Sequence, residues 1–415
     1  MFNKLFVRPL ALKRHLTSPL LEDRLRYLTH FAEQGAVWST LRCLAQYQLI
    51  IVKYLHLKKN SVVTLQEIQT AAVRWARHQI HHPRSRGTYS QFSKGRFIWK
   101  AIRWLRYVDR LKKVARPISF QVTDFANYMR KERGLSEVTI EYRCRETQIF
   151  LDQIRQKGYT LSRITVPQVE TILLEKLRHN SYNVRTIQTL ASTLRSFFRY
   201  AESRSWCRPA IAAAIKSPRT YRHASLPSSP TWDDVKRLLR TTQGNRPSQI
   251  RDRAILLLLA LYGLRAGEVA RLRIEDFNWE QETLHLTRGK GGRSQQFPLQ
   301  KTVGQALIRY LKKVRPHSNH RQVFLTLRAP IVPLRQGTLT ALVSRRWKPL
   351  HVSIQHHGPH SLRHACATRL INQGVSLKAI ADHLGHRDLE ATRLYAKVDL
   401  PRLREVANVN LRGLL

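Results

Sequence analysis

The chain has 415 residues and an unbalanced charge, with 73 lysines and arginines against 27 aspartates and glutamates, or +46 at pH 7. At about 150 residues per domain, this length predicts roughly three domains. The 42% hydrophobic content excludes a disordered basic tail. So large a positive charge on a folded chain predicts a polyanionic partner. Nucleic acid is the commonest candidate, and a membrane surface is the alternative.

Three features of the sequence indicate the cellular compartment: the N-terminus, the longest apolar run and the cysteines. Four basic side chains interrupt the first 21 residues, so no secretory signal is expected. The longest apolar run, residues 254–264, has 11 residues, well short of the ~20 that span a bilayer, and is predicted as a buried helix. Four cysteines occur without CxxC spacing, which fits a reducing compartment. We therefore expect a cytoplasmic, nucleoid-associated protein with no membrane partner.

Residues 1–115 form a predicted helical extension, because apolar residues such as Leu25, Leu28 and Phe31 recur three and four apart. Within it, residues 84–114 carry ten basic side chains and one acid, interleaved with six aromatic residues. One interpretation is a DNA-contacting element; the other is a solvated amphipathic helix on an oligomerisation module. The side chains that would contact phosphates are Arg96, Lys100, Arg103 and Arg106.

A second helical domain is predicted over residues 116–215, with Thr123 as a helix N-cap and Gly134 as a helix stop. Residues 216–231 combine Pro, Ser and Arg without periodicity, which is typical of a linker. The pattern favours a boundary between two domains there.

The last predicted domain spans residues 232–415, and its helical pattern resumes at Trp232. Residues 274–299 alternate in polarity and contain turn residues, which predicts a small antiparallel β-meander. Further on, Ser376 is a predicted helix cap and Gly385 a predicted helix stop. An apolar stripe over residues 400–411 predicts a C-terminal helix that docks either on a neighbouring subunit or on its own domain.

Four short motifs stand out in this last domain, in a fixed order. They are "LYGLRAGEV" with Arg265, "TRGKGGRS" with Lys290, "HSLRH" with His360 and Arg363, and "LGHRDLEATRLY" with His386 and Tyr395. The set resembles the tyrosine recombinase, or phage integrase, family, whose signature is Arg, Lys, His-x-x-Arg, His and a late nucleophilic Tyr. The resemblance includes Glu268 and covers about 225–400 strongly. It implies a mainly α fold with a small β-meander, arranged as a multidomain DNA clamp with a SAM-like core-binding domain.

The chemistry of a DNA phosphodiester explains these residue types, because attack at phosphorus builds negative charge on the non-bridging oxygens. Arg265 and Arg363 can each offer those oxygens a planar fork of donors. The resemblance implies that Tyr395 attacks phosphorus. A phenol with a pKa near 10 needs help to ionise, and His360 is the candidate base.

The resemblance assigns the remaining roles: Lys290 protonates the leaving 5′-oxygen, His386 hydrogen-bonds the phosphate, and Glu268 orients the site. It implies a covalent 3′-phosphotyrosyl intermediate, so strands rejoin without ATP, metal or any other cofactor. It also implies a homo-tetramer on two specific sites in double-stranded DNA. Sister recombinases and accessory DNA-bending proteins are further candidate partners. The basic extension favours a mobile element; integration, excision, resolution and transposition all fit this chemistry.

Two rival functions stay open at the level of sequence. One is a related enzyme, a type IB topoisomerase or a telomere resolvase, and the other is a DNA-binding regulator that has lost activity; the complete motif set argues against the regulator. A zinc hydrolase is disfavoured, because the five histidines between 351 and 364 have no carboxylate from 351 to 381. A phosphate-binding loop at Lys290 is rejected because Leu284 and Gly291 replace required residues.

Overall fold

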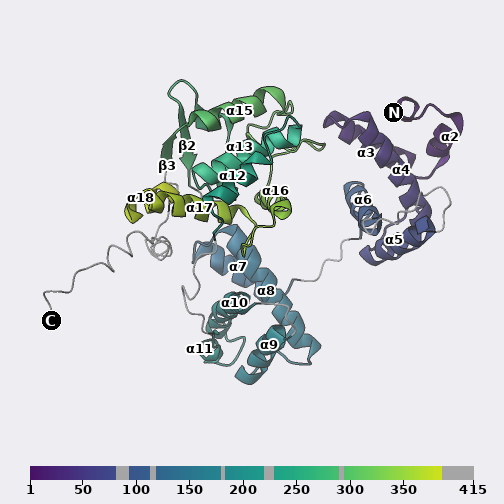
Figure 1. Ribbon diagram of the computed structural model, residues 1–415. Helices are drawn as coiled ribbons and strands as arrows, with labels where there is room; N and C mark the ends of the chain where they lie inside the picture. Colours follow the sequence, from purple (N-terminus) through teal and green to yellow (C-terminus); the bar gives the residue numbers. More distant parts are fainter. Residues whose placement is uncertain (81–92, 113–117, 179–182, 219–228, 289–293, 386–415) are drawn as a thin grey trace, which may run out of the picture. The chain divides into compact units, whose positions relative to one another are not determined.

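The computed structural model describes residues 1–80, 93–112, 118–178, 183–218, 229–288 and 294–385 (Figure 1). Most described residues are helical, and they contain one three-stranded antiparallel sheet. This confirms the predicted fold class. The chain divides into two compact units, of which one is 113–224 and the other combines 1–112 with 225–415.

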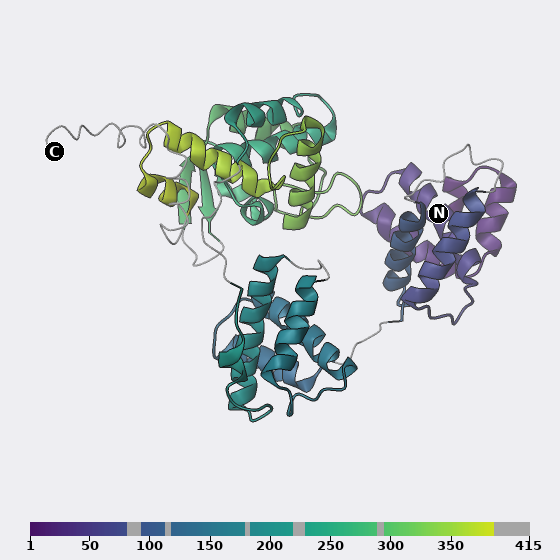
Figure 2. The same cartoon turned by 60° about the horizontal axis from the view of Figure 1, so that its bottom comes forward.

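Residues 1–112 form a bundle of helices around their own apolar core (Figure 2). The predicted periodicity is confirmed, because Leu28 and Phe31 are buried there. The helices are α1 (Phe2–Leu5), α2 (Pro9–Thr17), α3 (Leu21–Glu33), α4 (Trp38–Leu55), α5 (Leu65–Ile80) and α6 (Ser93–Tyr107).

The second unit is also helical and buries Phe125, Phe150, Phe197 and Phe198 in its core. Its helices are α7 (Phe120–Lys131), α8 (Glu137–Gln156), α9 (Val166–Arg178), α10 (Val184–Ser203) and α11 (Ile211–Ala214).

The predicted start of α7 is wrong, whereas its predicted end is confirmed. The N-cap is Ser119, and Thr123 lies within the helix. The reason is that the buried stripe already includes Val122, so the helix must begin before that residue to present it to the core. Gly134 follows the helix with φ +55°, the left-handed conformation expected of a stop.

The remaining part of the chain, residues 229–385, combines helices with the sheet. Its helices are α12 (Trp232–Arg240), α13 (Pro247–Leu261), α14 (Ala266–Arg271), α15 (Lys301–Lys313), α16 (Gln336–Trp347), α17 (Pro359–Asn372) and α18 (Leu377–Leu384), with 3-10 turns η1 (Ile274–Asp276) and η2 (Lys348–Leu350). The strands are β1 (Phe277–Asn278), β2 (Thr283–Thr287) and β3 (Ser294–Pro298), in the order β1-β2-β3.

Helix α13 is the centre of this part, because α12, α15 and α17 all pack against it (Figure 1). Its residues Ala254–Ala260 are all buried. The prediction of a buried helix is therefore confirmed for residues 254–261, but the helix begins earlier, at Pro247, and ends at Leu261, so that residues 262–264 of the apolar run lie in the turn that follows it. Such a run can be apolar on every side because no face of the helix meets water.

The predicted meander and the last predicted cap are both confirmed. In the sheet, Leu284 pairs with Phe277 on one side and with Phe297 on the other, and all three side chains are buried. The Ser376 side chain accepts a hydrogen bond from the N–H of Ala379 at the start of α18, and Gly385 ends that helix at φ +64°.

Gly263 lets α17 and α18 approach the turn that follows α13. It has φ +59°, and a Cβ there would lie 2.5 Å from Leu384 Cδ2 and 3.4 Å from Cys366 Sγ. Gly374, between α17 and α18, has φ +79°, but a Cβ there would meet no described atom within 4 Å. Both glycines have a positive φ, but only Gly263 has other atoms within contact distance of the Cβ position.

We expect Gly263→Ala to destabilise the protein more than Gly374→Ala. Both variants pay about 1–2 kcal/mol for a left-handed alanine, and Gly263→Ala adds about 1–3 kcal/mol because Leu384 must move. Thermal unfolding of the two variants checks this. Equal losses of Tm would contradict the proposed close approach.

Candidate active site

Arg363 joins two segments that are far apart in the sequence. It projects from the first turns of α17 and is only 2% exposed. Its guanidinium donates to the carbonyl oxygens of Gly263 and Leu384, at 2.6 Å each. Through these two hydrogen bonds, Arg363 connects the turn before Arg265 to the end of α18.

Arg265 reaches the same end of α18. It is the N-cap residue of α14, and its guanidinium donates to Gly385 O at 3.1 Å and to Glu268 Oε1 at 2.9 Å. Its side chain is 45% exposed, so an anion can approach it from solvent. Two arginines thus donate to successive carbonyl oxygens, those of Leu384 and Gly385, and their positive charges lie side by side.

Glu268 is the acid that makes this concentration of charge stable. Its carboxylate is 2% exposed, lies 2.9 Å from Arg265 and 2.9 Å from Arg288, and accepts the backbone N–H of Arg265 at 2.8 Å. Burial alone would raise the pKa of Glu268, but this N–H and the two guanidinium charges outweigh it and lower the pKa. The residue is therefore a carboxylate that fixes the orientation of Arg265.

Arg288 belongs to the same centre, although the motif search did not single it out. Its side chain is 6% exposed and donates to Glu268, to His383 O at 2.8 Å, and to Gln295 Oε1 at 2.6 Å. A signal was present in the sequence. Arg288 directly follows β2 and continues its alternation, so that Leu284, Leu286 and Arg288 are all buried.

His360 is the second residue of α17, and its ring lies 4.5 Å from that of His364. The pKa of His360 is lowered by desolvation and by the charges of Arg363 and Arg265. The helix N-terminus disfavours an imidazolium in the same direction. The neutral ring is the form that can accept a proton. Stronger desolvation lowers the pKa of His364 to about 4.

The structure therefore brings together four of the seven residues predicted for the site, namely Arg265, Glu268, His360 and Arg363. Lys290, His386 and Tyr395 lie outside the described residues. The described chain reaches to two residues before Lys290 and ends directly before His386.

The described residues contain no group of three or more His, Cys, Asp or Glu side chains that could hold a metal. In the same part of the chain, no helix has both the length and the apolarity needed to cross a membrane.

The four basic residues singled out in the extension lie on α6, whose Phe97, Trp104 and Leu105 are buried in the bundle. Arg96 and Arg106 are exposed. Lys100 lies 4.5 Å from the centre of the Tyr47 ring, and the Arg103 guanidinium lies over the rings of Trp99 and Phe31. Some aromatic side chains of α6 are thus packed in the core, and other aromatic rings hold two of the four basic side chains, Lys100 and Arg103, by cation–π contact.

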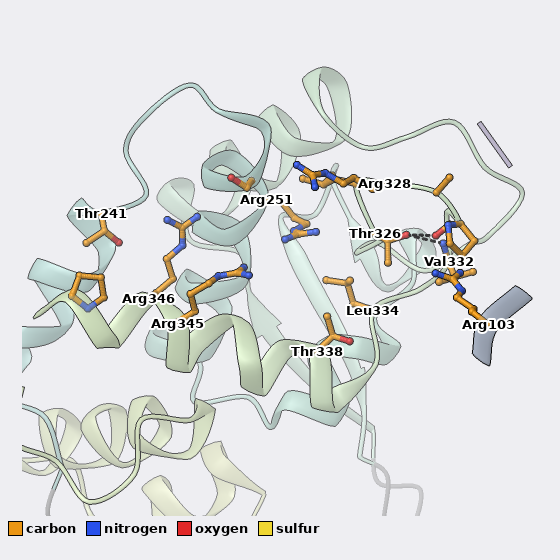
Figure 3. Close-up of a pocket in the computed structure, with 15 residues that line it drawn as sticks. Arg103, Thr241, Arg251, Thr326, Arg328, Val332, Leu334, Thr338, Arg345 and Arg346 are labelled. Carbon is orange, nitrogen blue, oxygen red and sulfur yellow. Dashed lines mark hydrogen bonds between the residues drawn. The ribbon is translucent and has the colours of Figure 1, made fainter. Parts of the chain in front are cut away.

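An arginine-lined pocket lies elsewhere in this part of the chain, at the start of α13 (Figure 3). Two of its arginines share one carboxylate, since Arg251 and Arg346 both bind the fully buried Asp252, at 2.9 and 2.6 Å. At 1.5 Å per residue, Arg251 is about 15 Å from the far end of the helix, where the candidate site begins. Asp252 therefore binds two arginines through one buried carboxylate, as Glu268 does in the candidate site.

The fold and the arginine–glutamate centre together define an integrase-type catalytic domain preceded by a helical domain. Residues 231–401 match the model described as the phage integrase family, and residues 122–205 match the phage integrase N-terminal SAM-like domain. The chain belongs to the phage integrase family, and so is a tyrosine recombinase. The family resemblance seen in the sequence is confirmed.

Relatives found by sequence carry recombinase names. The chain is 32% identical over 298 residues to a Sinorhizobium fredii protein named "Putative integrase/recombinase y4rF", a match that covers 71% of this chain and 70% of the relative. It is 33% identical over 285 residues to the tyrosine recombinase XerA of Pyrococcus horikoshii, covering 68% of this chain and 90% of XerA.

Solved structures with the same fold include XerH bound to a palindromic difH substrate after cleavage, with TM-score 0.54, 17% identity, and coverage of 83% of this chain and 96% of XerH. A lambda integrase dimer bound to a COC′ core site matches with TM-score 0.53 and 17% identity, over 66% of this chain and 94% of that one. The Tn1549 transposon integrase with transposon right-end DNA matches with TM-score 0.53 and 18% identity, over 68% and 99%.

The low pKa of His364 predicts a pH-dependent stability. Because its folded pKa of about 4 lies below the ordinary histidine value of 6.5, the unfolded chain binds more protons between these two pH values. The free energy of unfolding should therefore be unaffected by this group above about pH 6.5 and should fall as the pH drops from 6.5 towards 4. His364→Gln should flatten this slope by up to about 1.4 kcal/mol per pH unit, measured by urea unfolding. Identical slopes for the two proteins would contradict the assignment.

Proposed function

We propose that this tyrosine recombinase cuts and rejoins double-stranded DNA at specific sites through a covalent 3′-phosphotyrosyl intermediate. The observation that carries the proposal is the pairing of Arg265 and Arg363 at the end of α18, with Glu268 holding one arginine and the neutral His360 beside them. This centre is built to receive an anion next to a proton acceptor.

In the first step, the scissile phosphate binds at this centre. The exposed side of Arg265 receives a non-bridging oxygen, and Arg363 supplies positive charge from the buried side. Both charges are already held by protein acceptors, so they need little reorganisation when negative charge develops at phosphorus. His386, next in sequence to Gly385, adds a hydrogen bond to the same phosphate.

In the second step, the hydroxyl of Tyr395 attacks phosphorus and transfers its proton to His360. A bond forms between the phenolic oxygen and phosphorus, and the bond from phosphorus to the 5′-oxygen breaks. Lys290 gives that oxygen a proton, which yields a 5′-hydroxyl. The reverse attack by a 5′-hydroxyl of another strand rejoins the DNA.

The energy of the broken bond is kept in the phosphotyrosine, so the reaction uses no nucleotide. Arginines take the place that metal ions occupy in other phosphoryl-transfer sites, and we therefore propose a reaction without metal or cofactor.

We propose three domains and one linker: an extension (1–115), a SAM-like core-binding domain (116–215), a linker (216–231) and the catalytic domain (232–415). The apolar cores of the described residues support the division, since one lies within 2–111, one within 122–215 and one within 235–365, and a smaller cluster within 367–384 belongs to the catalytic part as well. The core-binding and catalytic domains would clamp the DNA between them.

We propose that the protein acts in the cytoplasm, at the nucleoid, as a homo-tetramer on two recombination sites. Sister recombinases and DNA-bending proteins remain proposed partners. A role in a mobile element has support from the likeness to the Tn1549 transposon integrase. The positive charge of the chain supports DNA as the partner.

The nucleophile can be tested by trapping the adduct on a suicide DNA substrate, in EDTA and without nucleotide. The protein should form a covalent complex under these conditions, and Tyr395→Phe should bind DNA equally well but form none. Adduct with Tyr395→Phe would refute the nucleophile, and strict dependence on Mg²⁺ would refute the metal-independent mechanism.

The general acid has a separate test. Lys290→Ala should slow cleavage by about 10²- to 10⁴-fold. A substrate with a sulfur in place of the leaving 5′-oxygen should restore most of the rate, because sulfur leaves without a proton. Single-turnover rates on both substrates measure this, and an unrestored rate would mean that Lys290 only grips the phosphate.

The extension can be tested through the salt dependence of DNA affinity. If the exposed Arg96 and Arg106 each contact a phosphate, changing both to Gln should flatten the log–log salt slope by up to about 1.8. The matched control changes Lys312 and Lys313, which are exposed on α15. Equal slopes in the two variants would argue against DNA contact by α6.

A further inference from the structure

The end of α18 is held by side chains from four other segments. The last four carbonyl oxygens of a helix have no partner within it, and near this end four successive carbonyls each accept a side-chain hydrogen bond. The donors are Gln295 to Asp382 O (3.1 Å), Arg288 to His383 O (2.8 Å), Arg363 to Leu384 O (2.6 Å) and Arg265 to Gly385 O (3.1 Å). Three of these donors are cations, which the negative end of a helix favours.

Arg288 is the member of this set that contacts the most segments. From the end of β2 it reaches Gln295 on β3, His383 on α18 and Glu268 on α14. Its Nη1 donates to Glu268, its Nη2 donates to both His383 O and Gln295 Oε1, and its Nε also donates to Gln295. A planar guanidinium offers these three donor atoms, where an ammonium offers a single nitrogen. The hairpin, α18 and Arg265 are therefore connected through one side chain.

Gly385 gives an independent observation of the same contact. A Cβ on this residue would lie 2.6 Å from Arg288 Nε and 2.9 Å from Arg288 Cζ. The guanidinium thus packs directly against the backbone of Gly385. A larger residue there would displace Arg288 from its partners.

The sequence places two proposed catalytic residues directly beyond these contacts. Lys290 comes two residues after Arg288, and His386 comes directly after Gly385. We propose that Arg288, assisted by Gln295, is a positioning residue. Its contacts to α18, Gln295 and Glu268 fix the end of β2, from which the chain leads directly to Lys290, and its role in the reaction is to place Lys290. The inference rests on the role of Lys290 proposed above.

The main test is a double-mutant cycle on single-turnover adduct formation. Arg288→Met should slow the reaction by about 10²-fold, the cost of a misplaced group, with DNA affinity unchanged. Because Arg288 acts through Lys290, the double variant Arg288→Met/Lys290→Ala should be little slower than Lys290→Ala alone. Multiplied effects in the double variant would overturn the proposal.

The 5′-sulfur substrate separates this proposal from the assignment of Lys290. Arg288→Met should regain much of its lost rate on that substrate, as Lys290→Ala should. If Lys290→Ala is rescued and Arg288→Met is not, the positioning role is wrong and the general acid stands. If neither is rescued, the general acid is wrong, and the double-mutant cycle still decides whether Arg288 acts through Lys290.

Arg346→Met is the matched control, because Arg346 also shares a buried carboxylate with a second arginine. It should lower Tm about as much as Arg288→Met while leaving the rate per folded molecule unchanged. Equal rate losses in both variants would reduce the role of Arg288 to general stability. If Arg288→Met does not fold, Arg288→Lys, which keeps a charge beside Glu268, replaces it in the same cycle.

A second pair of variants leaves Arg288 itself intact. Gly385→Ala should reproduce the slow rate and the sulfur rescue, since the new Cβ displaces the guanidinium. Gly374→Ala carries the same left-handed strain without that contact, and should keep the rate of the unmodified protein. Equal rates for the two alanine variants would also overturn the proposal.

Discussion

The buried carboxylate of Glu268 is the interaction on which the rest of the site depends. Arg265 and Arg288 both bind it, and Arg363 donates to the helix end that these two arginines also reach. Without an acid, guanidinium groups gathered this closely would repel one another and lose hydration with no compensation. With it, one face of Arg265 is fixed and the other stays open to an anion.

The chain solves the same problem twice, since Asp252 joins Arg251 and Arg346 at the opposite end of α13. The chain has only 27 acidic residues against 73 basic ones. Two of these acids, Glu268 and Asp252, are buried in the catalytic part. Acids placed in the interior hold arginines without neutralising the surface. The outer charge therefore remains available for a polyanion, as a DNA-binding enzyme requires.

Much of the local structure could be predicted because it depends on neighbouring residues. The buried α13, the β-meander and the α18 caps at Ser376 and Gly385 follow from apolar period, turn residues and capping chemistry. The prediction of Thr123 as a cap failed for the opposite reason. Ser119 and Thr123 are both good caps, and only the burial of Val122 decides between them.

The sequence by itself determined the family, through the ordered set Arg265, Lys290, His360, Arg363, His386 and Tyr395. The proposed chemistry explains these residue types, because a phosphodiester demands arginine forks, a proton acceptor and an acid. Only the tertiary structure decided how these residues are held. Arg288 and His383 are 95 positions apart and hydrogen-bonded. No local preference specifies such a contact, since it exists only once the sheet and α18 have packed together.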